Sequence, residues 1–391
     1  MPHDPRPAPE TIPSAEAAEP AERRPMVAPP GERLADVRKI AVLRGGGIGD
    51  LLFALPAITA LAAAYPDAEV TLLGAPAARL LDGRTGAPHR IVELPVAPGV
   101  HEPRGAESDP AAVERFLAEQ RAEGYDLVAQ MHGGGRFSNP FAAALGARCT
   151  IGTRTDDALA LDRSLPYVYF QHEVMRWLEV AGLVGAPPVD LEPRLLVTAD
   201  ERARGRERLG AAPRTVVVHP GATDPRRRWP VERFAAVAAE LTRAGARVAV
   251  IGDDSERALA DAFAAGAVAA GAAVEPLNLA GELPFAELPG LLAAADLCIA
   301  NDSGPRHLAQ AVGTATASVF WCGNLLNAGP LGRGRHRAQL SWTTHCPVCG
   351  RNSTQVGWTA PRCEHDLSFV TDVDAEAVLA DARALLEAPA R

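Results

Sequence analysis

Residues 39–64 read KIAVLRGGGIGDLLFALPAITALAAA, and this stretch decides the fold class. Its first six residues form a short apolar run that ends in glycines, which is typical of a strand buried in a parallel sheet. Residues 50–64 predict a helix, because Leu51, Leu55 and Ile58 recur near one face. A buried strand, a glycine loop and an apolar helix in succession predict an α/β fold.

The alternation of strand and helix continues on both sides of a proline-rich segment, 186–193. Before it we predict strands at 69–73, 90–94 and 126–131 and a helix at 111–123. After it we predict strands at 215–218, 247–251, 297–300 and 317–320, a helix at 231–242 and a last helix at 374–386. The pattern therefore predicts two Rossmann-like domains, 37–188 and 189–391, which face a central cleft and end in a C-terminal helix.

Composition narrows the class of protein. Hydrophobic residues make up 47% and charged residues 22% of the 391, which is typical of globular domains. The net charge of -9 argues against a nucleic-acid partner. Residues 1–36 are expected to be a disordered, proline-rich tail. No apolar run approaches the ~20 residues of a membrane span, and the cysteine pattern fits a reducing cytoplasm.

The glycine loop, 44–50, reads RGGGIGD. Gly47 and Gly49 allow a ligand to approach the backbone, and the start of the helix favours an anion. The dinucleotide fingerprint G-x-G-x-x-G does not fit, which argues against a dehydrogenase. Asp50 is either a helix N-cap or a reactive carboxylate, and one residue can serve both purposes.

Two further loops follow strands of the second half. The first reads HPGA at 219–222, which includes Gly221, and continues to RRRWP at 226–230; it predicts either a diphosphate site or a solvated basic loop. The second reads NDSGPRH at 301–307 and opens a helix, so Ser303 and Gly304 offer backbone amides to a phosphate. Asp302 and Ser303 could instead be simple helix caps. All three loops lie at the carboxyl ends of strands, where open α/β sheets bind ligands.

These motifs together resemble the heptosyltransferases of glycosyltransferase family 9. The resemblance runs from about residue 39 to the C-terminus. Four motifs match the pattern of that family. They are the Gly-Asp pair before an apolar helix with a proline (49–56), the Pro-Gly-Ala turn, the basic pair before Trp-Pro, and NDSGxxHLA at 301–309.

The resemblance implies a GT-B fold and an inverting transfer without a catalytic metal. It implies that the donor, most often ADP-heptose in the family, binds mainly to the C-terminal domain. By position, Asp50 matches the family's catalytic base and Arg227 its phosphate-binding lysine. The donor loop is matched by Asp302, Ser303, Gly304 and His307. Two segments depart from the family pattern, Pro305-Arg306 and the FWCGN turn at 320–324, and they put the donor sugar in question.

The mechanism expected from this chemistry needs a general base for the acceptor hydroxyl and positive charge for the departing diphosphate. Glu256 is either a ligand of the ribose or base, or an exposed carboxylate at a helix start. The partners expected are a nucleotide-diphosphate sugar and a glycan, a lipopolysaccharide core or a secondary metabolite. Contact with the inner membrane is expected only through a lipid-linked acceptor. A nucleotide-sugar epimerase and a non-catalytic nucleotide-sugar-binding protein stay open as alternatives.

Three of the six cysteines cluster near the C-terminus, in CPVC at 346–349 and CEH at 363–365. Two cysteines separated by two residues are typical of a zinc site, whereas the second half is less regular. Cys346, Cys349, Cys363 and His365 therefore predict either a structural zinc site or free, packed thiols.

Overall fold

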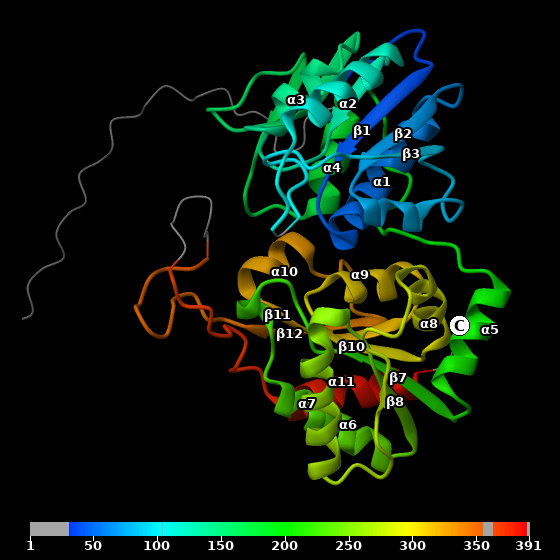
Figure 1. The fold of residues 1–391 in the computed structure, drawn as a ribbon, viewed down its shortest axis with the longest axis vertical. Coiled ribbons are helices and arrows are strands. Elements are labelled where there is room, and N and C mark those ends of the chain that lie inside the picture. The colour runs from blue at the N-terminus through cyan, green and yellow to red at the C-terminus, as the bar shows by residue number, and fades with distance from the viewer. Residues whose placement is uncertain (1–30, 104, 355–362, 389–391) are drawn as a thin grey trace, which may run out of the picture.

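The computed structural model describes residues 31–103, 105–354 and 363–388. Most of the predicted tail lies outside these residues. Its last six, 31–36, are described and contact the N-terminal domain: the Gly31 amide donates to the Gly182 carbonyl at 2.7 Å. Two α/β domains lie one above the other in Figure 1, each with a parallel sheet between helices.

The first domain holds a six-stranded parallel sheet in the order β3-β2-β1-β4-β5-β6. The strands are β1 (Lys39–Arg44), β2 (Glu69–Gly74), β3 (Arg90–Glu93), β4 (Leu127–Gln130), β5 (Cys149–Arg154) and β6 (Arg163–Pro166). Its helices are α1 (Ile48–Ala64), η1 (Pro76–Leu81), α2 (Pro110–Ala122), α3 (Ser138–Ala144) and α4 (Glu173–Gly182).

The second domain repeats this topology, in the order β9-β8-β7-β10-β11-β12. The strands are β7 (Arg214–His219), β8 (Ala246–Val250), β9 (Leu277–Asn278), β10 (Leu297–Asn301), β11 (Ala315–Trp321) and β12 (His336–Ser341). Its α-helices are α5 (Ala199–Leu209), α6 (Val231–Arg243), α7 (Arg257–Ala269), α8 (Leu288–Ala294), α9 (Gly304–Ala311), α10 (Cys322–Ala328) and α11 (Ala375–Glu387). Three short 3-10 turns are η2 (Pro225–Arg227), η3 (Asp254–Glu256) and η4 (Phe285–Glu287).

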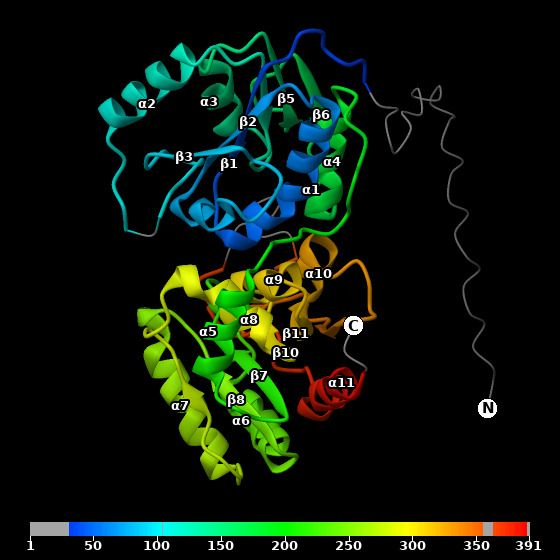
Figure 2. The ribbon, with the colours of Figure 1, turned by 90° about the vertical axis from the view of Figure 1, so that its right-hand side faces the viewer.

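This topology confirms the predicted α/β class. In each sheet the strand order reverses beside the first strand of the domain, between β1 and β4 and between β7 and β10. Ligands of doubly wound sheets bind in the crevice at such a switch point. The three predicted loops follow β1, β7 and β10, so the fold brings all of them to the junction between the domains (Figure 2). No helix among the residues that the structure describes is long and apolar enough to cross a membrane.

The domains touch where α1 meets α9, and two glycines allow this contact. A β-carbon on Gly49 would lie 3.0 Å from the Cδ2 atom of His307, and one on Gly304 would lie 2.7 Å from the Cγ2 atom of Ile48. The ring of Phe53 packs edge-on against His307, with centroids 4.7 Å apart. Side chains larger than glycine at these positions would push the domains apart.

Candidate active site

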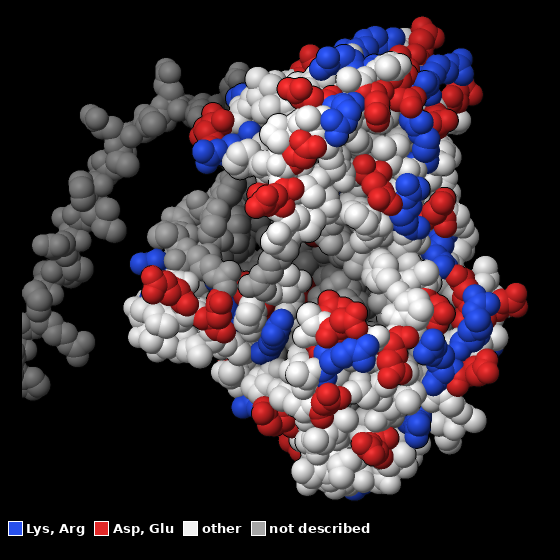
Figure 3. Space-filling view, viewed as in Figure 1, with Lys and Arg blue, Asp and Glu red and all other residues white. Residues whose placement is uncertain are grey.

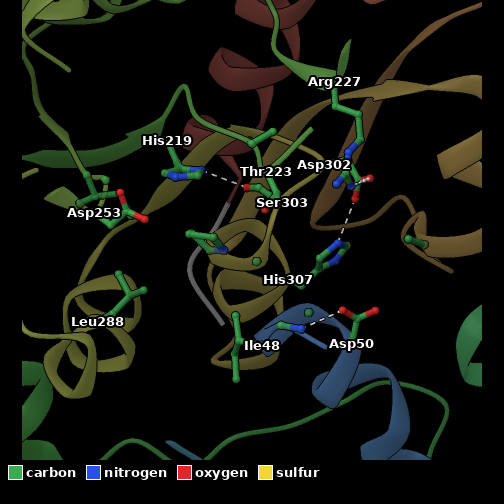
Figure 4. Close-up of a pocket in the computed structure, with 18 of the residues that line it drawn as sticks. Ile48, Asp50, His219, Thr223, Arg227, Asp253, Leu288, Asp302, Ser303 and His307 are labelled. Atoms are coloured by element: carbon green, nitrogen blue, oxygen red, sulfur yellow. Dashed lines mark hydrogen bonds and ion pairs between the residues drawn. The ribbon is translucent and has the colours of Figure 1, made fainter. Parts of the chain in front are cut away.

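A cavity of about 690 Å³ lies at this junction. Figure 3 shows a hollow between the two domains, and Figure 4 shows the side chains that line the cavity. Its lining includes nine of the residues predicted from the sequence: Gly47, Gly49, Asp50, Arg227, Glu256, Asp302, Ser303, Gly304 and His307. Gly221, also predicted for the donor site, is not part of the lining but lies next to the carboxylate of Glu256.

Asp50 comes from the N-terminal domain and its side chain is 51% exposed. Of its two interpretations, that of a helix N-cap is wrong, because α1 starts at Ile48 and Gly47 takes the cap position. Asp50 is the third residue of the helix, and its Oδ2 accepts a hydrogen bond from the Gly47 amide at 2.9 Å. Gly46 has φ +92° and leaves no room for a β-carbon beside this carboxylate. The loop therefore presents Asp50 to the cavity in a fixed orientation.

Arg44, which the sequence analysis did not assign, holds Asp50 from behind. Its buried guanidinium lies 3.1 Å from the Oδ1 atom of Asp50 and 3.1 Å from the Oε2 atom of Glu173. It also donates to the main-chain carbonyls of Asp50 and Met131, at 2.9 and 2.8 Å. A buried arginine needs such partners. The Arg44 guanidinium therefore orients the Asp50 carboxylate.

Asp302, directly after β10, is the centre of a buried network at the cavity. Its Oδ1 accepts from the Nε2 atom of His307 at 3.0 Å, and its Oδ2 accepts from the Nη1 atom of Arg227 at 3.0 Å and from Asn324. Burial alone would raise the pKa of Asp302, but these partners hold it well below its usual range. The carboxylate is therefore ionised and orients its three donors, as Figure 4 shows for His307 and Arg227.

The tautomer of His307 follows from its second neighbour. Arg306 can only donate, and its Nη1 lies 3.1 Å from the Nδ1 atom of His307. Nδ1 therefore accepts, and Nε2 carries the proton that is donated to Asp302. Burial lowers the pKa of His307, with the contact to Asp302 opposing it, which agrees with a neutral ring.

A second chain of contacts joins Ser303, His219 and Glu256. The ring of His219 lies 3.0 Å from Ser303 Oγ through Nδ1 and 3.1 Å from Glu256 Oε2 through Nε2. Burial alone would raise the pKa of Glu256, but its contact with His219 holds it below its usual range. The sequence analysis left open whether Glu256 is a donor ligand or an exposed carboxylate. Because Glu256 is partly buried at the cavity, the second interpretation is wrong. A β-carbon on Gly221 would lie 1.7 Å from Glu256 Oε1, so any larger residue there would displace this carboxylate.

The three arginines before Trp229 point to three different places. Arg226 forms an ion pair with Asp224, and Arg228 donates to the Ala222 carbonyl at 2.8 Å. Of the three, Arg227 alone lines the cavity.

Asn301 and Trp229 have structural roles beside these arginines. The buried Asn301 side chain accepts from the Trp229 amide at 3.0 Å and donates to the Pro220 carbonyl at 2.8 Å. Asn301 thereby ties the loop after β7 to the loop after β10, and so fixes the position of Arg227 relative to Asp302.

Two residues of the cavity lining, Asn324 and Glu173, were missed in addition to Arg44. Asn324, which donates to Asp302, belongs to the turn that departs from the family pattern, so a departure in sequence supplies a cavity side chain. Glu173 lines the cavity at the start of α4, a helix that the sequence analysis did not predict. The signal that could have found Arg44 was a charged residue at the end of an otherwise apolar strand.

The cysteine and histidine residues form a separate group outside the cavity lining. One ligand atom from each of Cys346, Cys349, Cys363 and His365 lies within 4.8 Å of the other three. All six cysteines of the chain are described, and each is a free thiol. The residues that the sequence placed in one group therefore come together in the fold.

Comparison with known proteins agrees with this architecture. The model of glycosyltransferase family 9 (heptosyltransferase) matches residues 113–352. Lipopolysaccharide heptosyltransferase 3 of Escherichia coli is 25% identical over 353 residues, which cover 86% of this chain and 95% of that protein.

Two solved structures share the fold. The family 9 glycosyltransferase from Veillonella parvula has a TM-score of 0.72 at 16% identity, covering 91% of this chain and 99% of its own. The E. coli ADP-heptose lipopolysaccharide heptosyltransferase II has a TM-score of 0.68 at 18% identity, covering 89% and 98%. The two Rossmann-like domains are thus those of a GT-B enzyme, and the chain belongs to glycosyltransferase family 9.

Proposed function

We propose that this glycosyltransferase transfers a sugar, with inversion, from a nucleotide-diphosphate donor to a hydroxyl of a glycan acceptor. ADP-heptose is the donor that the relatives favour, because one is described as a lipopolysaccharide heptosyltransferase and another as acting with ADP-heptose. The observation that carries the proposal is that Asp50 of the N-terminal domain lines the same cavity as Arg227 and the Ser303 loop of the C-terminal domain.

The donor side supplies positive charge. Arg227 uses one N–H of its guanidinium for Asp302 and retains others for phosphate oxygens. The amides at Ser303 and Gly304 open α9 and add the partial positive charge of a helix start. Together they would stabilise the charge that develops on the departing diphosphate. We therefore propose that the transfer itself needs no metal.

The acceptor side supplies the base. The acceptor hydroxyl attacks the anomeric carbon from the face opposite the diphosphate and forms the new C–O bond. The bond from the anomeric carbon to the diphosphate breaks, and its electron pair stays on the phosphate oxygen. Asp50 takes the hydroxyl proton, and Arg44 keeps that carboxylate oriented.

The first test measures donor choice and the role of Asp50 together. Calorimetry with ADP, GDP, UDP and dTDP is expected to give the tightest binding for ADP. Asp50→Asn is expected to bind ADP like the wild type and to lower kcat by about 10²-fold or more, as loss of a general base does. Asp67→Asn, an exposed carboxylate after α1, is the matched control.

The products separate the alternatives. Transfer to a lipopolysaccharide-core acceptor, detected by mass spectrometry, supports the proposal. Conversion of ADP-heptose without any acceptor would instead indicate an epimerase, and nucleotide binding without turnover would indicate a binding protein. Activity of Asp50→Asn equal to the wild type would remove Asp50 from the mechanism.

We also make proposals about the compartment of the enzyme and about the role of a bound metal. Six unpaired cysteines fit a reducing compartment, so we place the enzyme in the cytoplasm, in contact with the inner membrane only through a lipid-linked acceptor. We propose that a tightly bound metal is structural and sits at the cysteine–histidine group. Turnover in EDTA is then expected to equal turnover in Mg²⁺, provided that the protein's own metal content, measured in the same sample, is unchanged.

A further inference from the structure

The group formed by Cys346, Cys349, Cys363 and His365 has the composition of a closed tetrahedral metal site. Three thiols and one imidazole are soft ligands that select zinc over Mg²⁺ or Ca²⁺. With Zn–S bonds of ~2.3 Å, ligand atoms of such a site lie roughly 3.5–4 Å apart, so the present spread of 4.8 Å needs only a small contraction.

An unpartnered nitrogen points to the same conclusion. The Nδ1 atom of His365 is buried and has no hydrogen-bond partner. A buried polar atom without a partner is costly unless something binds it. Cys346 and Cys349 lie on one turn. The turn is formed without a metal, because the Gly350 amide donates to the Cys346 carbonyl at 2.9 Å and Gly350 has φ +67°.

The metal group is connected to the donor cavity through Arg226. Its guanidinium lies 5.7 Å from the centroid of the Phe369 ring, four residues after His365. The Phe369 amide donates to the Arg226 carbonyl at 2.8 Å. Arg227, the next residue, faces the cavity.

A second connection runs through α10. The ring of Phe369 packs against Trp321 with centroids 5.8 Å apart, and Trp321 donates to the Thr343 carbonyl at 2.6 Å. Trp321 is the cap of α10, which carries Asn324. Arg227 and Asn324 both donate to the same oxygen of Asp302, so both connections end at the donor network.

We propose that these four residues bind one Zn²⁺, and that the bound ion holds residues 343–349 and 363–369 against Trp321 and Arg226, and so positions Arg227 and Asn324 for the donor. The binding of the ion stands on the four ligands alone. Its effect on the donor rests on the proposed function.

The experiment uses tag-free, full-length protein and Cys349→Ser. Cys349 is exposed, so its replacement removes a ligand with little loss of packing. Val348→Ser is the matched control, an exposed residue on the same turn without a ligand atom. Elemental analysis is expected to give about one zinc per wild-type chain and at least tenfold less in Cys349→Ser. The variant should also melt at a lower temperature and bind ADP about 5-fold or more weakly.

The outcomes separate the claims. Wild-type protein that is folded and carries no zinc would overturn the site, and iron in place of zinc would overturn the identity of the ion. A zinc-free Cys349→Ser that binds ADP like the wild type would overturn the connection to the donor network. Should that variant not fold, cobalt exchange into wild-type protein replaces it, because thiolate ligation gives an intense charge-transfer band and its absence refutes the site. Failure of the wild type to bind any nucleotide would defeat the proposed function but not the zinc content.

Discussion

Replacing Arg227 tests whether the protein itself neutralises the diphosphate. The Arg227 side chain is 27% exposed, and its Nη1 lies 3.0 Å from the buried carboxylate of Asp302. A hydrogen bond between charged groups contributes about 1.5–3 kcal/mol, so Arg227→Ala should weaken ADP binding by roughly 10- to 150-fold. The same change also leaves Asp302 with only His307 and Asn324 as partners, so some stability should be lost as well.

Two companion variants separate these effects. Arg227→Gln keeps an amide donor for Asp302 but removes the charge, so it should retain most of the stability and still lose ADP affinity. Arg206→Ala removes an exposed charge from α5 and is the control for net charge. Calorimetry gives the affinity, and urea unfolding gives the stability. If all the Arg227 variants bind ADP like the wild type, the diphosphate does not contact this side chain. If Arg228→Ala alone weakens binding, the family's phosphate-binding lysine corresponds to Arg228 and not to Arg227.

Two further predictions concern a glycine and a histidine. Gly221→Ala should displace the Glu256 carboxylate, because the new carbon would lie 1.7 Å from its Oε1 atom, and lower ADP affinity; Gly334→Ala, which has open space, should not. Equal affinity in both variants would exclude Glu256 from the donor site. Burial lowers the pKa of His336 from 6.5 to about 4, so between these values the unfolded chain binds a proton that the folded chain does not, and the free energy of unfolding decreases as the pH is lowered. At pH 5 the loss from His336 is about 2 kcal/mol relative to pH 7. Urea unfolding of His336→Gln at both pH values should show a correspondingly smaller difference, and an unchanged difference would contradict the assignment.

The sequence predicted the elements whose apolar pattern is strong. The strands that became β1, β2, β7 and β10 are nearly continuous runs of buried aliphatic residues, and each was placed to within about two residues. Four strands were missed: β5, which is interior, and β6, β9 and β12, which lie at sheet edges, whereas the edge strand β3 was predicted. β6 reads RSLP and β12 reads HRAQLS, and neither has the apolar run that marks a buried strand. Their pairing is provided by β5 and β11, so tertiary context and not local pattern determines them.

The residues of the candidate site also fall into two groups, those that the sequence could identify and those that it could not. Residues that follow a predicted strand, such as Asp50 and Asp302, could be found, because the carboxyl ends of parallel strands meet at one edge of the sheet. Arg44 could not be assigned, since its partner Glu173 is 129 residues away along the chain and joins it only in the folded domain. Asn324 was recognised only as a departure from the family pattern, and its contact with Asp302 depends on where α10 begins.

The contact between Gly49 and His307 links the proposed base to the proposed donor network. His307 donates to Asp302, which also holds Arg227, while the other face of its ring lies against Gly49 and Phe53 of the N-terminal domain. Gly49 immediately precedes Asp50 in the chain. A movement of α9 relative to α1 must therefore shift Asp302 and Asp50 relative to each other, because close-packed interfaces transmit displacement. With no side chain on Gly49 to separate the helices, the distance between the proposed base and the proposed diphosphate site is determined at this contact.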